Sequence, residues 1–195
     1  LSQEAKYEHC LEDPRIVLLD GTYYLSYVAY DDKNVRLAYA TSKDPKKFEK
    51  KGPLLPDISY DKAEDLFRSC KSRLKDRYFL FESFYKDHDG KDVLLWDKDW
   101  FFFPKKINGK FALIHRILPD IQVLYFKNFK DLKLNFWENY LKNLCSYIVL
   151  EAKHWFENRN IGGGCPPIET DKGWLFIYHG VDDMNFGRIY RAGAA

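Results

Sequence analysis

Three segments of the chain repeat one phrase: a proline, a short apolar piece, a two-residue turn ending in glycine, and an alternating aromatic-aliphatic run. They read DPRIVLLDGTYYLSY from Asp13, FPKKINGKFALIH from Phe103 and PPIETDKGWLFIYH from Pro166. Asp-Gly and Asn-Gly between apolar runs are strong hairpin signals, because a type I′ turn needs positive φ at both central residues. Three such hairpins predict an all-β chain built from repeated antiparallel units.

The spacing of these hairpins favours a β-propeller over a β-sandwich. They recur roughly every 60 to 90 residues with irregular stretches between them, as blades with insertions do. Six residues after each turn glycine stand Tyr27, His115 and His179. Side chains alternate between the faces of a strand, so equal offsets put these three on equivalent faces of equivalent strands. We expect them to face one another across a central channel, the alternative being that each is a core or edge residue.

Two longer stretches separate the hairpins and are expected to be blade elements with insertions. Residues 60–90 begin as a charged, helix-like segment and are expected to end in a strand and an Asp-Gly turn. Residues 127–160 are ambiguous between helix and strand. A chain of 195 residues can bury one sizeable core, so we expect residues 1–195 to form a single domain.

Composition excludes several classes of partner. The 31 basic and 29 acidic residues nearly cancel, which gives no argument for nucleic acid. No run approaches the ~18 apolar residues that a membrane-spanning helix needs. The four cysteines have no metal-binding spacing and are interpreted as free thiols of a reducing compartment, hence of a cytoplasmic protein without a metal site. Aromatic residues reach 17%, which suits β structure and sites that stack sugars.

Charged residues next to the repeated strands supply the candidate site. In CLEDPRI, Asp13 stands directly before a proline, which favours an extended backbone there. Arg15 follows two positions later and is expected to share its face, so an ion pair is the structural alternative to a reactive acid. In WDKDWFFFPKK, Lys98 stands between two aspartates and ahead of four aromatic residues. It marks either a solvated turn or an ammonium group at the mouth of an aromatic pocket.

Further polar groups lie in the second half of the chain. HRILPDI supplies Arg116 and Asp120. IGGGCPP supplies the glycines 162–164, where we expect backbone amides to approach a ligand closely. The two prolines that follow stiffen the entry to the strand that carries Tyr178 and His179.

One acid, Asp13, thus accompanies several groups that bind anions. These groups are Lys33, Asn34, Arg36, Lys98, Arg116 and His179. An inverting hydrolase needs a second carboxylate to activate water, which would have to come from a residue such as Glu12, Glu151 or Asp120. Inorganic phosphate is already charged, so as a nucleophile it needs a cationic cradle and no general base. The residues therefore favour phosphorolysis of a glycoside over its hydrolysis.

The motifs, in this order, resemble glycoside hydrolase family 130, which comprises β-mannoside and β-1,4-mannooligosaccharide phosphorylases and their relatives. The resemblance rests on LEDPRI, DGTYYLSYVAY, DKDWFFFPKKINGKFALIHR with PDI, and IGGGCPPIETDKGWLFIYHGV. It implies inverting cleavage of a β-mannoside by inorganic phosphate to give mannose 1-phosphate. It also implies no cofactor beyond phosphate as co-substrate.

The resemblance further implies roles for particular residues. Asp13 would be the catalytic acid, delivering its proton through a hydroxyl of the bound mannose. The phosphate ligands would be drawn from Lys98, His179, the neighbouring Tyr178, and a loop site that is either Lys33–Asn34 or Arg36. The sugar subsite would be lined or braced by Arg15, His115, Arg116 and Asp120.

The family implies a five-bladed β-propeller with the active site in its central channel. A chain of 195 residues is short for such a ring, which predicts an incomplete propeller of about three blades, either as a fragment or as a truncated gene product. An unclosed ring exposes strand edges, which favours association into a homo-oligomer. The alternatives on the same fold are an inverting β-mannosidase and a degenerate propeller that binds carbohydrate without chemistry.

Overall fold

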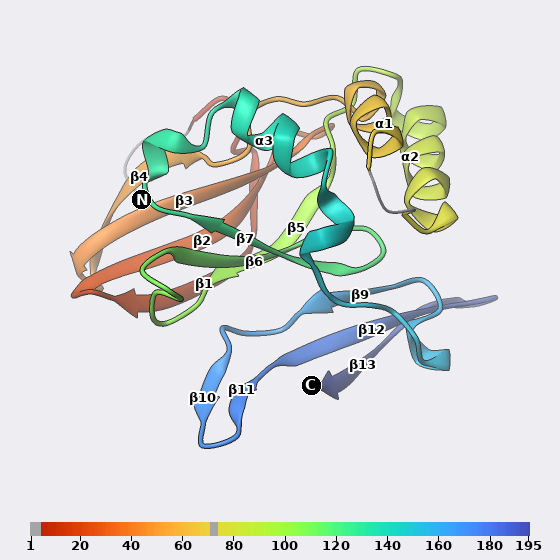
Figure 1. Cartoon of the computed structure of the whole chain (residues 1–195). Coiled ribbons are helices and arrows are strands. Elements are labelled where there is room, and N and C mark those ends of the chain that lie inside the picture. The colour runs from red at the N-terminus through yellow and green to blue at the C-terminus, as the bar shows by residue number, and fades with distance from the viewer. Residues whose placement is uncertain (1–4, 71–73) are drawn as a thin grey trace.

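Three antiparallel sheets follow one another along the chain (Figure 1). The structure is a computed structural model that describes residues 5–70 and 74–195. In this part of the chain the first sheet has the order β1-β2-β3-β4, the second β5-β6-β7-β8 and the third β13-β12-β9. Each is a meander of the kind that forms a propeller blade, so the prediction of a mostly β, incomplete propeller of about three blades is confirmed.

The first sheet comprises β1 (Cys10–Leu19), β2 (Thr22–Tyr30), β3 (Val35–Asp44) and β4 (Lys47–Pro53). The second comprises β5 (Asp97–Phe102), β6 (Phe111–Ile117), β7 (Ile121–Phe126) and β8 (Ile148–Leu150). The third comprises β9 (Asn160–Gly163), β12 (Ile177–Met184) and β13 (Gly187–Ala194). A separate hairpin is formed by β10 (Ile168–Thr170) and β11 (Gly173–Leu175).

Two of the three predicted type I′ turns form. The φ values are 49° and 65° at Asp20–Gly21, and 49° and 72° at Asn108–Gly109. At Lys172–Gly173 only the glycine has a positive φ, of 127°. This third hairpin stands apart as β10–β11, and the strand that carries His179 continues beyond it as β12.

Helices fill the stretches between the sheets. They are α1 (Tyr60–Arg68), α2 (Asp76–Asp89), α3 (Leu134–Leu141) and the short 3-10 helices η1 (Phe129–Asp131), η2 (Leu144–Tyr147) and η3 (Trp155–Glu157). The strand expected near residue 90 is wrong, because α2 continues to Asp89. Tyr78, Glu82 and Tyr85 recur at helical spacing and form its buried face. None of the described helices is both long and apolar enough to cross a membrane.

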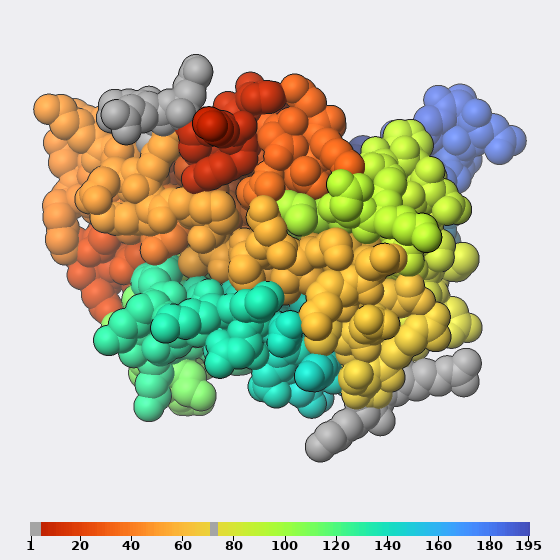
Figure 2. Space-filling model, turned by 90° about the horizontal axis from the view of Figure 1, so that it is seen from above, coloured from red at the N-terminus to blue at the C-terminus, as the bar shows by residue number. Residues whose placement is uncertain are grey.

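The largest hydrophobic core joins the first two sheets to the helices. Leu37 of β3, Leu113 of β6 and Trp137 of α3 are fully buried in it. Trp137 Nε1 also donates a hydrogen bond to Leu54 O at 2.9 Å. Burial of each such side chain is worth about 1.5–3 kcal/mol. Figure 2 shows the face of the molecule on which the segments that contain α1, α2 and α3 lie next to one another.

Candidate active site

Matching bulges interrupt β1 and β5, the first strands of the first two sheets. In β1 two residues beginning at Asp13 stand opposite Tyr27 alone. In β5 two residues beginning at Asp99 stand opposite His115 alone. Both aspartates have left-handed backbones, with φ of 51° and 54°. A bulge redirects a side chain out of the regular alternation of its strand, so each of these strands presents one aspartate at an equivalent place.

The backbone at Asp13 therefore differs from the extended form expected before a proline, because the bulge outweighs that local preference. The expected pairing with Arg15 also differs. Arg15 donates to the backbone oxygens of Asp13, Gly163 and Gly164 at 2.9, 2.8 and 3.1 Å. Within the described part of the chain, no hydrogen bond or ion pair engages the exposed carboxylate of Asp13.

The equal offsets of Tyr27, His115 and His179 bring only His179 to the cavity. Tyr27 is buried and donates to Glu8 Oε1 at 2.8 Å. His115 is fully buried, and its ring nitrogens lie 2.7 Å from Asp97 Oδ2 and 2.7 Å from the Tyr140 hydroxyl. The expectation that the three face one another is wrong, because Tyr27 and His115 stand opposite the bulges and are buried in the interior.

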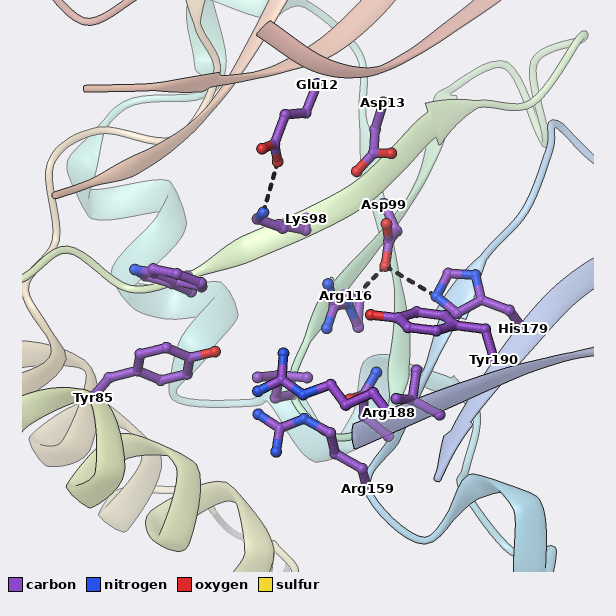
Figure 3. A pocket seen from close by; sticks show the side chains of 14 residues that line it. Glu12, Asp13, Tyr85, Lys98, Asp99, Arg116, Arg159, His179, Arg188 and Tyr190 are labelled. Carbon is purple, nitrogen blue, oxygen red and sulfur yellow. Dashed lines mark hydrogen bonds and ion pairs between the residues drawn. The ribbon is translucent and has the colours of Figure 1, made fainter. Parts of the chain in front are cut away.

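The bulges open into a cavity of about 290 Å³ (Figure 3). Its inner wall carries Glu12, Asp13, Lys98, Asp99, Arg116 and His179, which come from all three sheets. The far wall carries Tyr85, Arg159 and Arg188, whereas Trp96 lies beside Lys98 and Tyr190 beside His179. The sequence-predicted acid therefore shares one cavity with three of the predicted anion-binding groups.

An ion pair joins the first two sheets at the cavity. Lys98 Nζ lies 2.9 Å from Glu12 Oε2, where the two side chains are 21% and 43% exposed. The ammonium group also lies 5.4 Å from the centre of the Trp96 ring. Of the two alternatives for Lys98, the structure shows an ammonium group at an aromatic-walled pocket.

The carboxylate of Asp99 lies among three basic side chains, those of Arg116, His179 and Arg15. Its Oδ2 lies 2.8 Å from Arg116 Nε and 3.9 Å from His179 Nε2, and its Oδ1 lies 3.8 Å from Arg15 Nη2. A Cβ at Gly162 would stand 2.3 Å from Asp99 Oδ2 and 2.5 Å from His179 Nε2. Glycines 162 and 163 are buried in β9, so they make room for side chains. This corrects the expectation that these two glycines present amides to a ligand.

His179 is uncharged at neutral pH. Burial lowers the pKa of its imidazole below the usual 6.5, with Asp99 raising it and Arg116 and Arg15 lowering it. The negative charge of Asp13, on the wall of the same cavity, also raises this pKa. A neutral imidazole can donate a hydrogen bond through one ring nitrogen.

Two guanidinium groups on the far wall did not stand out in the sequence. Arg159 precedes β9, and its Nη1 lies 2.7 Å from Asp183 Oδ2. Arg188 is the second residue of β13, and its Nε lies 3.5 Å from Asp183 Oδ1. In Figure 3 both guanidinium groups extend toward Tyr85 of α2. The signal available in the sequence was weak, because Arg188 and Tyr190 alternate along a strand that was not predicted.

The loop residues expected at the phosphate do not line this cavity. Lys33 Nζ pairs with Asp92 at 3.1 Å, and Asn34 Oδ1 accepts from the backbone of Leu94 at 3.0 Å. Arg36 forms ion pairs with Asp31 and Asp57 at 2.5 and 3.0 Å. Their side chains hold the β2–β3 loop to the chain around residues 57 and 92–94, so either version of the predicted loop site is replaced by structural contacts.

Two further candidates are fully or largely buried outside the cavity. Asp120 is 0% exposed and accepts from the Tyr78 hydroxyl at 3.1 Å and the Ala152 backbone at 2.9 Å. Tyr178 donates to Glu157 Oε1 at 2.7 Å. Neither side chain lines the cavity, whereas Arg116 does.

One cluster of carboxylates has metal-like spacing among residues 5–70 and 74–195. Asp61, Glu64 and Glu82 lie between α1 and α2. Lys86 Nζ stands 2.7, 3.0 and 2.7 Å from them, and Arg68 also pairs with Glu64, so an ammonium group already occupies the centre of the cluster. This cluster is separate from the cavity.

Comparison with known proteins relates this chain to mannoside phosphorylases. A family model described as β-1,4-mannooligosaccharide phosphorylase matches residues 3–195. The chain is 32% identical over 187 residues to the 1,2-β-oligomannan phosphorylase of Thermoanaerobacter sp. (strain X514), covering 94% of this chain and 46% of that protein.

Solved structures share the fold. The β-1,2-mannobiose phosphorylase of Listeria innocua, solved with β-1,2-mannobiose, matches with a TM-score of 0.61 and 23% identity over 97% of this chain and 41% of that chain. A structure from work on mannoside phosphorylases and on hydrolases that target β-1,2-mannosidic linkages of Candida mannan matches with a TM-score of 0.59 and 22% identity, over 97% and 49%. The chain thus spans about half the length of its relatives.

Proposed function

This chain belongs to glycoside hydrolase family 130, and from that premise we propose that the protein is an inverting phosphorylase of β-mannosides. Inorganic phosphate would displace the leaving group and yield mannose 1-phosphate. The observation that carries the proposal is the single cavity in which the unpaired carboxylate of Asp13 accompanies Lys98, Arg116 and His179.

Asp13 is the acid in this proposal. Its carboxylate is exposed to the cavity and has no partner among the residues described, so it is available to a bound sugar. Protonation of the departing oxygen, directly or through a sugar hydroxyl, removes the need to expel an alkoxide. Such general acid catalysis contributes about 10²- to 10⁴-fold.

Phosphate would lie against the cations on the other side of the sugar. Lys98 and Arg116 supply charge, the neutral imidazole of His179 supplies a hydrogen bond, and Tyr190 lies beside it with ring centres 5.5 Å apart. Holding the anion opposite the leaving group favours in-line displacement with inversion. Both cations give up part of an existing ion pair, with Glu12 and Asp99 respectively, when the anion binds.

The linkage is part of the proposal. The relatives described above act on β-1,2-linked mannosides, whereas the matching family model is described by β-1,4-mannooligosaccharides. We favour β-1,2-mannosides because the 32% identical relative carries that name. Incubation with β-1,2-mannobiose and with β-1,4-mannobiose, each with and without phosphate, tests both points. Mannose 1-phosphate formed only with phosphate supports the proposal, and equal release of free mannose without phosphate overturns it.

A specific observation keeps hydrolysis as the second candidate. Of the three carboxylates considered as a base for water, only Glu12 lines the cavity with Asp13. Glu151 pairs with Lys75 at 3.3 Å, and Asp120 is enclosed. A binding module without chemistry is the third candidate, and calorimetric binding of mannoside without any turnover would favour it.

A further inference from the structure

We propose that Asp99 is a positioning residue: its carboxylate holds the Arg116 guanidinium and the His179 imidazole together as one anion-binding unit. The inference rests on the proposed function, in which these two groups receive phosphate. Asp99 itself need touch neither phosphate nor sugar.

The backbone of Asp99 is built for this placement. It stands at the bulge of β5 with a φ of 54°, a conformation that is costly for residues other than glycine, asparagine and aspartate. The bulge turns the carboxylate toward β6 and β12, where Arg116 and His179 stand on separate sheets (Figure 3). One residue therefore reaches two ligand groups that no single strand could present together.

The surroundings fit the carboxylate closely. Its side chain is 6% exposed, and Oδ2 lies 2.8 Å from Arg116 Nε and 3.9 Å from His179 Nε2. Gly162 stands directly behind both groups, because a Cβ there would lie 2.3 Å from Asp99 Oδ2. The neighbouring strand leaves space for this contact and for little else.

Two of the atoms involved keep hydrogen-bonding capacity. Asp99 Oδ2 and Arg116 Nε are buried, and neither makes an aligned hydrogen bond among the described residues despite their 2.8 Å approach. Such groups are costly to bury without compensation. The arrangement is explained if the pair realigns when an anion engages Arg116.

A purely electrostatic role for Asp99 makes the opposite prediction. A carboxylate beside an anion site repels the anion, so its removal alone should tighten phosphate binding. A positioning role predicts weaker binding, because Arg116 and His179 lose their common anchor. The sign of the change in phosphate affinity therefore separates the two roles.

The test uses calorimetric phosphate binding to the protein and its variants. We expect Asp99→Asn and Gly162→Ala each to raise the phosphate Kd about tenfold, since displacements near 1 Å cost up to a hundredfold at such sites. Gly162→Ala keeps the charge of Asp99 but displaces both its carboxylate and the His179 imidazole. It therefore tests the packing of the whole unit, and it does so even if Asp99→Asn fails to fold. Asp97→Asn is the control: this carboxylate lies on the same strand and is 1% exposed, and it contacts His115 and the backbone amide of Arg116 but not the Arg116 guanidinium. The side-chain oxygen of asparagine can still accept from that amide.

A second readout follows the imidazole directly. The chain has five histidines, and the proton resonance of His179 can be assigned by its loss in His179→Gln. We expect Asp99→Asn to lower the pKa of His179 further, as loss of a nearby opposite charge does. We expect Asp97→Asn to lower the melting temperature and leave both the pKa and the phosphate Kd unchanged.

Three outcomes would overturn the proposal. These are a phosphate Kd that falls in Asp99→Asn, a Kd that stays constant in Gly162→Ala, or an equal rise in the Asp97→Asn control. Neither readout needs turnover. Absence of mannoside phosphorolysis with the expected Kd changes would therefore count against the proposed function and leave the positioning role supported.

Discussion

The substitution Glu12→Gln separates phosphorolysis from hydrolysis. In the proposed phosphorolysis, Glu12 has no chemical role and only forms an ion pair with Lys98, with 2.9 Å between Oε2 and Nζ. At 43% and 21% side-chain exposure, such a pair is worth about 0.5–1 kcal/mol. Removing the charge releases Lys98 for phosphate, so the phosphate KM should fall by roughly two- to fivefold. The mannoside KM should change little.

The assay is initial-rate release of mannose 1-phosphate at saturating mannoside and varied phosphate. Glu169→Gln is the matched control. Glu169 of β10 also forms an ion pair with a lysine, Lys105, and neither residue lines the cavity. A double-mutant cycle with Lys98→Met completes the test: the single Lys98→Met change should raise the phosphate KM roughly 10- to 150-fold, the worth of a charged hydrogen bond. In that background the benefit of Glu12→Gln should shrink. Loss of all turnover in Glu12→Gln would refute the reasoning and identify Glu12 as the base of a hydrolase.

Three further predictions concern the acid, pH and stability. Asp13→Asn should lower kcat by about 10²- to 10⁴-fold without changing the melting temperature, because its carboxylate has no protein partner to lose; a large drop in melting temperature would indicate a structural acid. The pKa of His179 is held below 6.5, so the unfolded chain takes up its proton first, and the free energy of unfolding should fall as pH drops below about 6.5. Urea titrations at several pH values should show a smaller dependence in His179→Gln, and an unchanged dependence would contradict this assignment. Lys86→Met leaves Asp61 and Glu82 without this cation and Glu64 with Arg68 alone, and should cost about 2–3 kcal/mol in urea unfolding, less than for a fully buried pair because part of the cluster is exposed. Arg68 and Lys86 together lower the pKa of Glu64 to about 2, so the variant should raise it, and unchanged stability would show that Arg68 alone suffices for the cluster.

The hairpin repeat was sufficient to predict the propeller, because turn chemistry and strand alternation are local. Asp20–Gly21 and Asn108–Gly109 adopt the φ values that their sequence predicts. The run YFLFESFY lies in the stretch that was expected to end in a strand, yet it belongs to α2, because its buried residues Tyr78, Glu82 and Tyr85 have helical spacing. The local sequence pattern alone does not decide whether such a stretch packs as a helix or as a strand.

Sequence motifs identified those residues of the site that lie within a motif. They did not identify residues whose contacts depend on how separate strands are aligned with one another. Asp13, Lys98, Arg116 and His179 line one cavity. Asp99 escaped notice as a connecting group because its contacts depend on a bulge and on a glycine in another sheet. Similarly, Lys33 and Arg36 were predicted to bind phosphate but form ion pairs with nearby aspartates instead. The composition of the loop does not show that these aspartates lie within reach.

The most direct measurement is an electron-density map from crystals soaked in phosphate and mannose. The account predicts tetrahedral density against Lys98, Arg116 and His179, with the sugar lying between that anion and the carboxylate of Asp13. Density for the anion outside this cavity, or a sugar bound with Asp13 and the anion on the same side of its ring, would contradict the account.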